Sequence, residues 1–176
     1  MNAVVSLSSD QGSPDIAIDI TCNLWNEVDF DLTDKCRASV IEAIACGSQD
    51  TRVPEISIVL ADDAFVRNLN RAWRGVDAPT NVLAFPCSDG EELTDTDAER
   101  LLGDVVVAFQ TTKREASEFG ISFEHHFAHL IVHGVLHLLG YDHIEDHEAT
   151  LMETLEVKAL SELGIDDPYR EEIGDG

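Results

Sequence analysis

The amino-acid sequence predicts an α+β fold, in which a small mixed sheet and several helices surround one buried central helix within a single domain, residues 1–176. Three observations lead to this prediction. Segments with strand-like alternation are interspersed with segments of helical periodicity, and no repeat or linker divides them. The length of 176 residues suits one hydrophobic core. The segment 123–139 is apolar around most of its helical circumference, as expected of a helix enclosed by other elements.

The first half of the chain contains three strand-like and two helix-like segments. Residues 1–14 are small and polar, and we expect them to be flexible. Both helix-like segments begin at acidic or hydroxyl capping residues and stop at a glycine, Gly47 or Gly75. We expect strands at 15–21, 55–61 and 81–86, and helices at 31–47 and 62–75.

The second half is richer in helix. Residues 88–100 are acidic and have no apolar periodicity, so we expect a loop there. The tail, residues 166–176, is expected to be flexible and exposed to solvent. We expect a strand at 104–110 and helices at 111–120, 123–139 and 147–163.

Composition limits the classes of function. The chain has 35 acidic and 11 basic residues and a formal net charge of -24, which argues against a broad nucleic-acid-binding surface. The four cysteines are scattered, as is typical of reduced thiols rather than a disulfide framework. No apolar run approaches the roughly 18 residues that a membrane span needs. The N-terminal sequence also lacks the features of a secretory signal, so we expect a cytoplasmic protein without membrane partners.

The segment "HGVLHLLGYDH", residues 133–143, has the spacing H-x-x-x-H-x-x-G-x-x-H. His133 and His137 lie one helical turn apart, so their rings can point at one metal ion. Gly140 lets the chain leave the helix, and the following turn brings His143 back toward the same point. Three imidazoles leave the fourth tetrahedral position open, which is typical of catalytic zinc. Imidazole also binds nickel, copper and iron, so zinc is the first choice among several metals.

Other histidines extend this pattern. His129 lies one turn before His133 and is a candidate for a fourth ligand, for a hydrogen-bonding partner of a ligand, or for a substrate contact. We expect His126 to be hydrogen-bonded in a groove, and His125 and His147 to lie on the surface. The alternative for the whole set is a stripe of hydrogen-bonded histidines without metal. A structural zinc would need a fourth ligand, and beyond the candidate His129 none is evident.

Zinc proteases with this spacing place a glutamate base directly after the first histidine, but here Gly134 occupies that position. Asp142 is a candidate acid or base beside the last histidine. A phosphodiester substrate needs such a base less, and it benefits more from a cation that holds the phosphate.

Basic residues gather in two short segments. Arg67, Arg71 and Arg74 share one side of the helix expected at 62–75, and Lys113 and Arg114 follow the strand expected at 104–110. A phosphate-binding surface is one interpretation, and an ordinary solvated helix face is the other.

Three motifs stand out together: "HGVLHLLGYDH" at 133–143, "LNRAWRGVDAPTNVLAFP" at 69–86 and "GDVVVAF" at 103–109. Through these motifs the sequence resembles the YbeY family of metal-dependent endoribonucleases. The resemblance implies a single α+β domain, zinc held by His133, His137 and His143, and a catalytic arginine at Arg74. It also implies a single-stranded RNA substrate, a role in maturation of the 3′ end of 16S ribosomal RNA and in ribosome quality control, and the ribosome or small-subunit proteins as partners.

The sequence and the resemblance together predict a zinc-dependent, single-strand-specific endoribonuclease, with nickel as an alternative metal. Arg74 would neutralise charge on the phosphate. His129 and Asp142 are the candidates for proton transfer, and the ribose 2′-hydroxyl is a candidate nucleophile. Two alternatives stay open, a metalloprotease with another base and a ribosome-assembly factor with a stabilising zinc. Weaker RNA-backbone contacts are assigned to Arg67, Arg71, Lys113 and Arg114.

Overall fold

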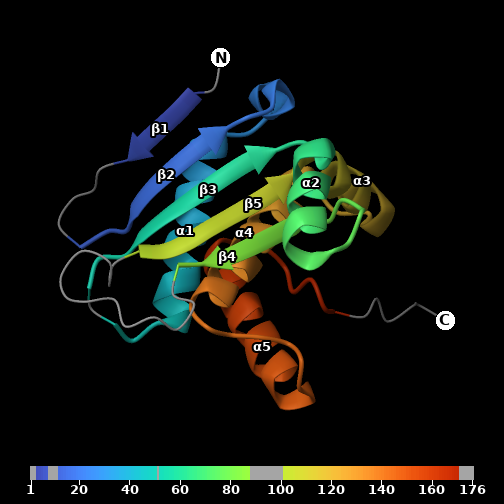
Figure 1. The fold of residues 1–176 in the computed structure, drawn as a ribbon. Coiled ribbons are helices and arrows are strands. Elements are labelled where there is room, and N and C mark those ends of the chain that lie inside the picture. Colours follow the sequence, from blue (N-terminus) through green and yellow to red (C-terminus); the bar gives the residue numbers. More distant parts are fainter. Residues whose placement is uncertain (1–2, 8–11, 51, 88–100, 171–176) are drawn as a thin grey trace.

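The computed structural model describes residues 3–7, 12–50, 52–87 and 101–170. Within these residues the chain forms a five-stranded mixed sheet with the strand order β1-β2-β3-β5-β4 (Figure 1). β2, β3 and β5 are parallel, and the two outer strands are antiparallel to their neighbours. The loop expected at 88–100 lies outside the described residues. The strands are β1 (Ala3–Leu7), β2 (Asp15–Ile20), β3 (Glu55–Ala61), β4 (Val82–Pro86) and β5 (Leu101–Ala108).

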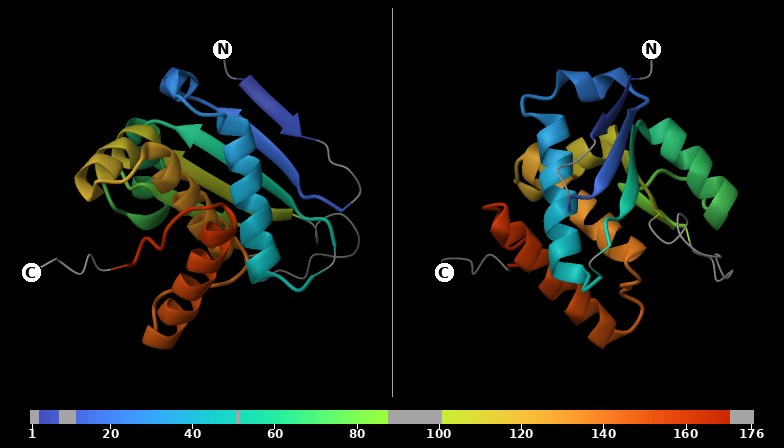
Figure 2. Two further views of the ribbon diagram at one scale, coloured as in Figure 1. Left: turned by 180° about the vertical axis from the view of Figure 1, so that it is seen from behind. Right: turned by 90° about the vertical axis from the view of Figure 1, so that its left-hand side faces the viewer.

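The helices form unequal layers on the two faces of the sheet (Figure 2). α1 (Leu32–Gly47), α4 (Phe123–Leu138) and α5 (Asp146–Glu162) lie on one face, with α4 in contact with both β4 and β5. α2 (Asp63–Arg74) lies on the opposite face, and α3 (Phe109–Phe119) follows β5 at one end of the sheet. In the part of the chain that the structure describes, no helix has the length and apolar character of a membrane span.

Side chains of β5 alternate between the two faces of the sheet, so this one strand contributes to two hydrophobic clusters. Val105 and Val107 are buried with α1 and α4, whereas Val106 and Ala108 are buried against α2. Because successive side chains of a strand point to opposite faces, a continuous apolar run is the expected sequence of such a strand. The α4 core is the larger of the two clusters, as predicted for a helix that is apolar on most of its surface.

The structure corrects two predictions of secondary structure and adds one element. Residues 3–7 form β1 instead of a flexible segment, because they pair with β2 along its outer edge. β5 begins at Leu101 and gives way to α3 at Phe109, so the strand expected at 104–110 is shifted toward the N-terminus. The short 3-10 helix η1 (Asn23–Glu27) was not predicted; it buries Trp25, whose indole N–H donates to the carbonyl oxygen of Ala61 at 2.9 Å.

The C-terminal segment also differs from the flexible tail that was expected at 166–176. Ile165 is buried, and the exposed chain that follows carries the Tyr169 hydroxyl back to a hydrogen bond with Glu156 of α5. The hydrogen bond from Tyr169 therefore attaches residues 166–170 to α5. Residues 171–176 lie outside the described part of the chain.

Candidate metal centre

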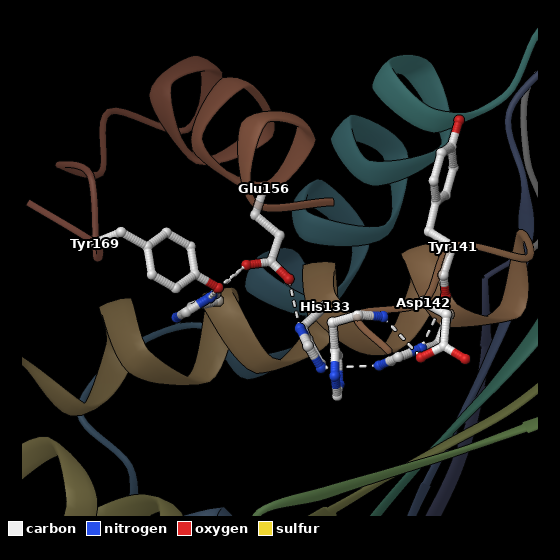
Figure 3. Close-up of polar contacts among 8 residues, drawn as sticks. His133, Tyr141, Asp142, Glu156 and Tyr169 are labelled. Carbon is white, nitrogen blue, oxygen red and sulfur yellow. Dashed lines mark hydrogen bonds and ion pairs between the residues drawn. The ribbon is translucent and has the colours of Figure 1, made fainter. Parts of the chain in front are cut away.

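The three histidines of the sequence motif converge at the C-terminal end of α4 (Figure 3). Each can offer a ring nitrogen such that the three nitrogens lie within 4.8 Å of one another. The Nε2 atoms of His133 and His137 are 3.0 Å apart. The ring of His143 lies 5.7 Å from that of His133 and 5.1 Å from that of His137, measured between centroids. These residues can hold a metal ion.

A tight turn returns the chain from α4 to the cluster. Gly140 has φ +100°, which glycine adopts without steric cost and which most other residues do not. The Tyr141 hydroxyl donates to the carbonyl oxygen of Gly47 at 2.8 Å and so attaches the turn to α1. Asp142 Oδ1 accepts the backbone N–H of His143 at 2.7 Å. The turn that was expected from Gly140 is therefore present, and it is fixed at both ends.

Hydrogen bonds orient two of the three imidazoles. Nδ1 of His137 lies 2.9 Å from the carbonyl oxygen of Tyr141, which can only accept, so this Nδ1 carries the proton. Nδ1 of His133 contacts the Glu156 carboxylate in the same way. In the neutral form of each ring Nε2 is then the unprotonated nitrogen, and the two Nε2 atoms face each other. This is the donor set that a divalent transition metal requires.

The protonation of the cluster suits metal binding. Burial, together with the neighbouring His133 and His143, lowers the pKa of His137 to about 4. Burial alone would raise the pKa of Glu156, but hydrogen bonds from His129, His133 and Tyr169 outweigh it and lower the pKa to about 2. At neutral pH His137 is therefore a neutral imidazole and Glu156 is an anion.

The cluster opens into a cleft of about 520 Å³ between α4, β4 and the turn after α4. All three histidines of the motif line this cleft, and so do Arg74 and Asp142. Arg74 is the last residue of α2 and is exposed to solvent. Residues far apart in the sequence, the "WRG" segment and the histidine motif, thus share one cavity. Thr80, Asn81, Val82, Ala84, Pro86, Gly134, Gly140 and Tyr141 complete its walls.

Gly134, the residue at the position of the missing protease base, is buried where α4 lies against the sheet. A Cβ at this position would lie 2.7 Å from Cγ1 of Val105 and 3.1 Å from its Cγ2. Such distances are shorter than normal contacts, so the site has no space for a side chain. The absence of glutamate is therefore a condition for packing α4 against β5.

The structure places the other proposed site residues outside this cleft. The Nε2 atom of His129 lies 3.0 Å from Glu156 Oε2, on the side of His133 away from the cleft lining. Arg67 forms an ion pair with Asp77 at 2.8 Å. Lys113 lies over the ring of Phe109, and Arg114 is 3.8 Å from Glu118. Arg71 is exposed and does not line the cleft.

Of the remaining histidines, His125 and His147 lie on the surface as predicted, whereas His126 is hydrogen-bonded as predicted but is buried rather than placed in a groove. His126 is buried, and its Nε2 lies 2.8 Å from Glu115 Oε2, which also accepts from the Asn81 side chain. His125 and His147 are exposed.

Sequence reasoning missed Glu156 and Tyr169, which contact His133 and His129 from the C-terminal part of the chain. The sequence contains one feature that points to Glu156. Glu156 lies on the same side of its helix as Met152, Ala159 and Leu160, so a charged residue interrupts a buried apolar stripe. The partner of that charge, 23 positions earlier in the chain, could not be read from periodicity.

The fold and the cleft together define a small α+β protein with a three-histidine site that can hold a metal ion. Comparison with protein families is consistent with this class, because the family model described as "Endoribonuclease YbeY" matches residues 19–164. The chain belongs to the YbeY endoribonuclease family, as the three sequence motifs indicated.

Curated relatives and a solved structure extend the match over most of the chain. The endoribonuclease YbeY of Paramagnetospirillum magneticum is 52% identical over 161 residues, covering 90% of this chain and 97% of the relative. The endoribonuclease YbeY of Methylocella silvestris is 45% identical over 161 residues, covering 91% and 88%. A solution structure of a Thermotoga maritima protein, at 24% identity, matches the fold with a TM-score of 0.52 and covers 89% of this chain and 99% of that one.

Proposed function

We propose that this chain is a metal-dependent endoribonuclease that cuts single-stranded RNA in the cleft between α4 and β4. The observation that carries the proposal is the placement of Arg74 and the three motif histidines around one cavity. A cation and a metal-binding cluster in a shared, solvent-open site are the parts that phosphodiester cleavage requires. Membership of the YbeY family supports the same activity.

His133, His137 and His143 would hold the ion through one ring nitrogen each. A metal ion held there supplies Lewis-acid polarisation of a phosphoryl oxygen and lowers the pKa of water. Zinc is the proposed metal because three imidazoles with an open fourth position are typical of catalytic zinc, and nickel is the alternative.

Arg74 would bind the scissile phosphate and neutralise charge that develops on its oxygens. A guanidinium can donate two parallel hydrogen bonds to a phosphate, which fixes orientation as well as charge. Its position at the end of α2 brings this group to the cleft from the far side of the sheet.

Asp142 is the better placed of the two proton-transfer candidates, because it lines the cleft whereas His129 does not. One carboxylate oxygen of Asp142 accepts the backbone N–H of His143, which holds the group beside the last ligand. The attacking nucleophile is water or the ribose 2′-hydroxyl. His129 is then assigned to the hydrogen-bond network behind His133.

The proposed cellular substrate is the 3′ end of 16S ribosomal RNA, with the ribosome or small-subunit proteins as partners, a part in ribosome quality control and a cytoplasmic location. The family name and the motifs support this assignment. Arg67, Arg71, Lys113 and Arg114 are proposed as weaker contacts to RNA backbone outside the cleft.

The experiment is a cleavage assay on a labelled single-stranded RNA, with bound metal measured on the same preparations. We expect Arg74→Ala to keep its metal and to lose about 10²–10³-fold in cleavage rate, the usual effect of removing one group that stabilises transition-state charge. His137→Ala should lose both metal and cleavage. Arg52→Ala is the matched control, because this arginine is bonded to Asp50 outside the cleft and should cleave at the wild-type rate.

Full cleavage by His137→Ala would rule out the metal mechanism. RNA that is bound but never cut by the metal-loaded wild type would instead indicate an assembly factor. Cleavage of casein with RNA left intact would indicate a protease. A precursor that carries the 3′ end of 16S ribosomal RNA, compared with an unrelated RNA of equal length, tests the proposed substrate.

A further inference from the structure

Glu156 is a fully buried carboxylate at the centre of α5, with 0% of its surface exposed. Three groups surround it (Figure 3): the imidazoles of His133 and His129 and the hydroxyl of Tyr169. A buried charge is costly unless it is fully hydrogen-bonded, because the protein interior replaces its hydration poorly. These donors compensate for that cost, and each comes from outside α5.

The two carboxylate oxygens have separate partners. Oε1 contacts Nδ1 of His133, and Oε2 contacts both Nε2 of His129, at 3.0 Å, and the Tyr169 hydroxyl. The Oε1 contact keeps the proton of His133 on Nδ1 and thereby presents Nε2 to the cluster. The Oε2 contacts prevent the carboxylate from rotating away.

We propose that Glu156 is a positioning residue that fixes the tautomer and ring orientation of the ligand His133, and that Tyr169 locks this carboxylate from the C-terminal segment. The inference rests on the proposed metal site and goes beyond it, since neither residue lies in the histidine motif or lines the cleft. A carboxylate bonded to a ligand imidazole raises its basicity and restricts its rotation, and loss of such a partner typically weakens metal binding 10–100-fold.

Tyr169 links the tail to the metal centre. Ile165 is buried and anchors the chain just after α5, and the backbone N–H of Tyr169 donates to Asp167 Oδ1 at 2.8 Å. The phenol also contacts Nε2 of His129 at 3.3 Å, and the two rings meet edge to face with centroids 5.6 Å apart. Docking of residues 165–169 therefore closes the network on the side opposite the cleft.

The test measures the zinc affinity of the full chain by competition with a chelator at constant pH. We expect Glu156→Gln to bind zinc at least tenfold more weakly, because a neutral amide is a weaker acceptor for His133. Tyr169→Phe removes only the hydroxyl and should weaken binding severalfold while leaving the fold intact. Glu162→Gln, the same change at an exposed position of α5, is the matched control and should bind zinc as wild type does.

Nitrogen NMR of the metal-free protein separates positioning from a merely structural role. In wild type the His133 ring should carry its proton on Nδ1, and in Glu156→Gln the two tautomers should both be populated. Wild-type zinc affinity in both variants, with an unchanged His133 tautomer, would overturn the proposal. The NMR measurement needs neither RNA nor metal, so it tests the role of Glu156 even if the wild type has no ribonuclease activity. A lack of ribonuclease activity would overturn the proposed function alone.

Discussion

At Gly134 the lack of a side chain bears both on the packing of α4 against the sheet and on the chemistry of the candidate site. The position lies directly after the first metal-ligand candidate, where a zinc protease carries its base, and here α4 and Val105 leave no space for any Cβ. The sequence revealed that the base was absent. The reason for the absence, contact between a helix and a sheet, required the fold.

Replacing Gly134 by alanine should therefore destabilise the protein. Alanine has the higher helix propensity, by up to about 1 kcal/mol. The new methyl group would lie 2.7 Å from a Val105 methyl, however, and overpacking of this kind costs about 1–3 kcal/mol. Urea unfolding of the metal-free protein measures the net loss. Val105→Ala in the same chain should recover part of it, and a Gly134→Ala variant as stable as wild type would contradict the packing argument.

His126 offers a test of protonation away from the proposed ligands. Burial lowers its pKa despite the bond to Glu115, and the other titratable group facing it is His129 on the same helix. Because the folded-state pKa lies below the unfolded value near 6.5, the unfolded chain binds more protons as the pH falls through that value. His126 therefore favours unfolding progressively below about pH 6.5.

Comparison of wild type with His126→Gln isolates this effect. Between pH 7.5 and 5.0 the metal-free wild type should lose more unfolding free energy than the variant, which keeps a polar group beside Glu115 but does not titrate. Urea unfolding at several pH values provides the measurement. Parallel pH profiles of the two proteins would show that His126 is not held neutral by burial.

At the scale of the elements, hydrophobic periodicity predicted every α-helix and the four strands from β2 to β5 among the described residues, with shifts at their ends. It failed for β1, whose five residues are stabilised by pairing with β2 rather than by a pattern of their own. It also failed for η1, which is too short to show a period. Contacts between distant segments decide such cases, and local sequence carries little information about them.

The residues of the candidate site also fall into two groups, those that local sequence predicts and those that depend on contacts between distant segments. His133, His137 and His143 could be predicted because a helical turn and a glycine turn bring neighbours in sequence together. The pattern of basic residues gave Arg74 as one of several candidates, and only the family resemblance singled it out, since its approach to the cleft depends on the pairing of β4 with β5. Glu156 and Tyr169 depend on the packing of α5 and the tail against α4, which the sequence does not specify.

At the scale of the whole molecule, the net charge of -24 limits how RNA can be held. Three of the four residues proposed as weaker RNA contacts already have partners, in the Arg67–Asp77 pair, the Arg114–Glu118 pair and the contact of Lys113 with Phe109. A strongly negative net charge with a single arginine in the cleft lining favours a short contact with few phosphates over a long electrostatic track.

RNA binding should accordingly depend only weakly on salt. For single-stranded nucleic acid the logarithm of affinity falls with the logarithm of salt concentration with a slope of about -0.7 per phosphate contacted. We expect a slope of about -1 to -2 for this chain. The measurement is RNA affinity of the metal-free protein between about 50 and 300 mM potassium chloride. A slope steeper than about -4 would contradict this prediction and indicate contact with an extended basic surface.

The position of the ligands along the chain also bears on how the protein is made. The three imidazoles, their buried carboxylate and the tyrosine behind it all belong to the last quarter of the sequence, whereas the arginine of the cleft is translated long before them. A nascent chain that has just completed its sheet carries the arginine but none of these later residues. The complete centre thus arises only after Tyr169 has been synthesised, and products that terminate before this residue lack it.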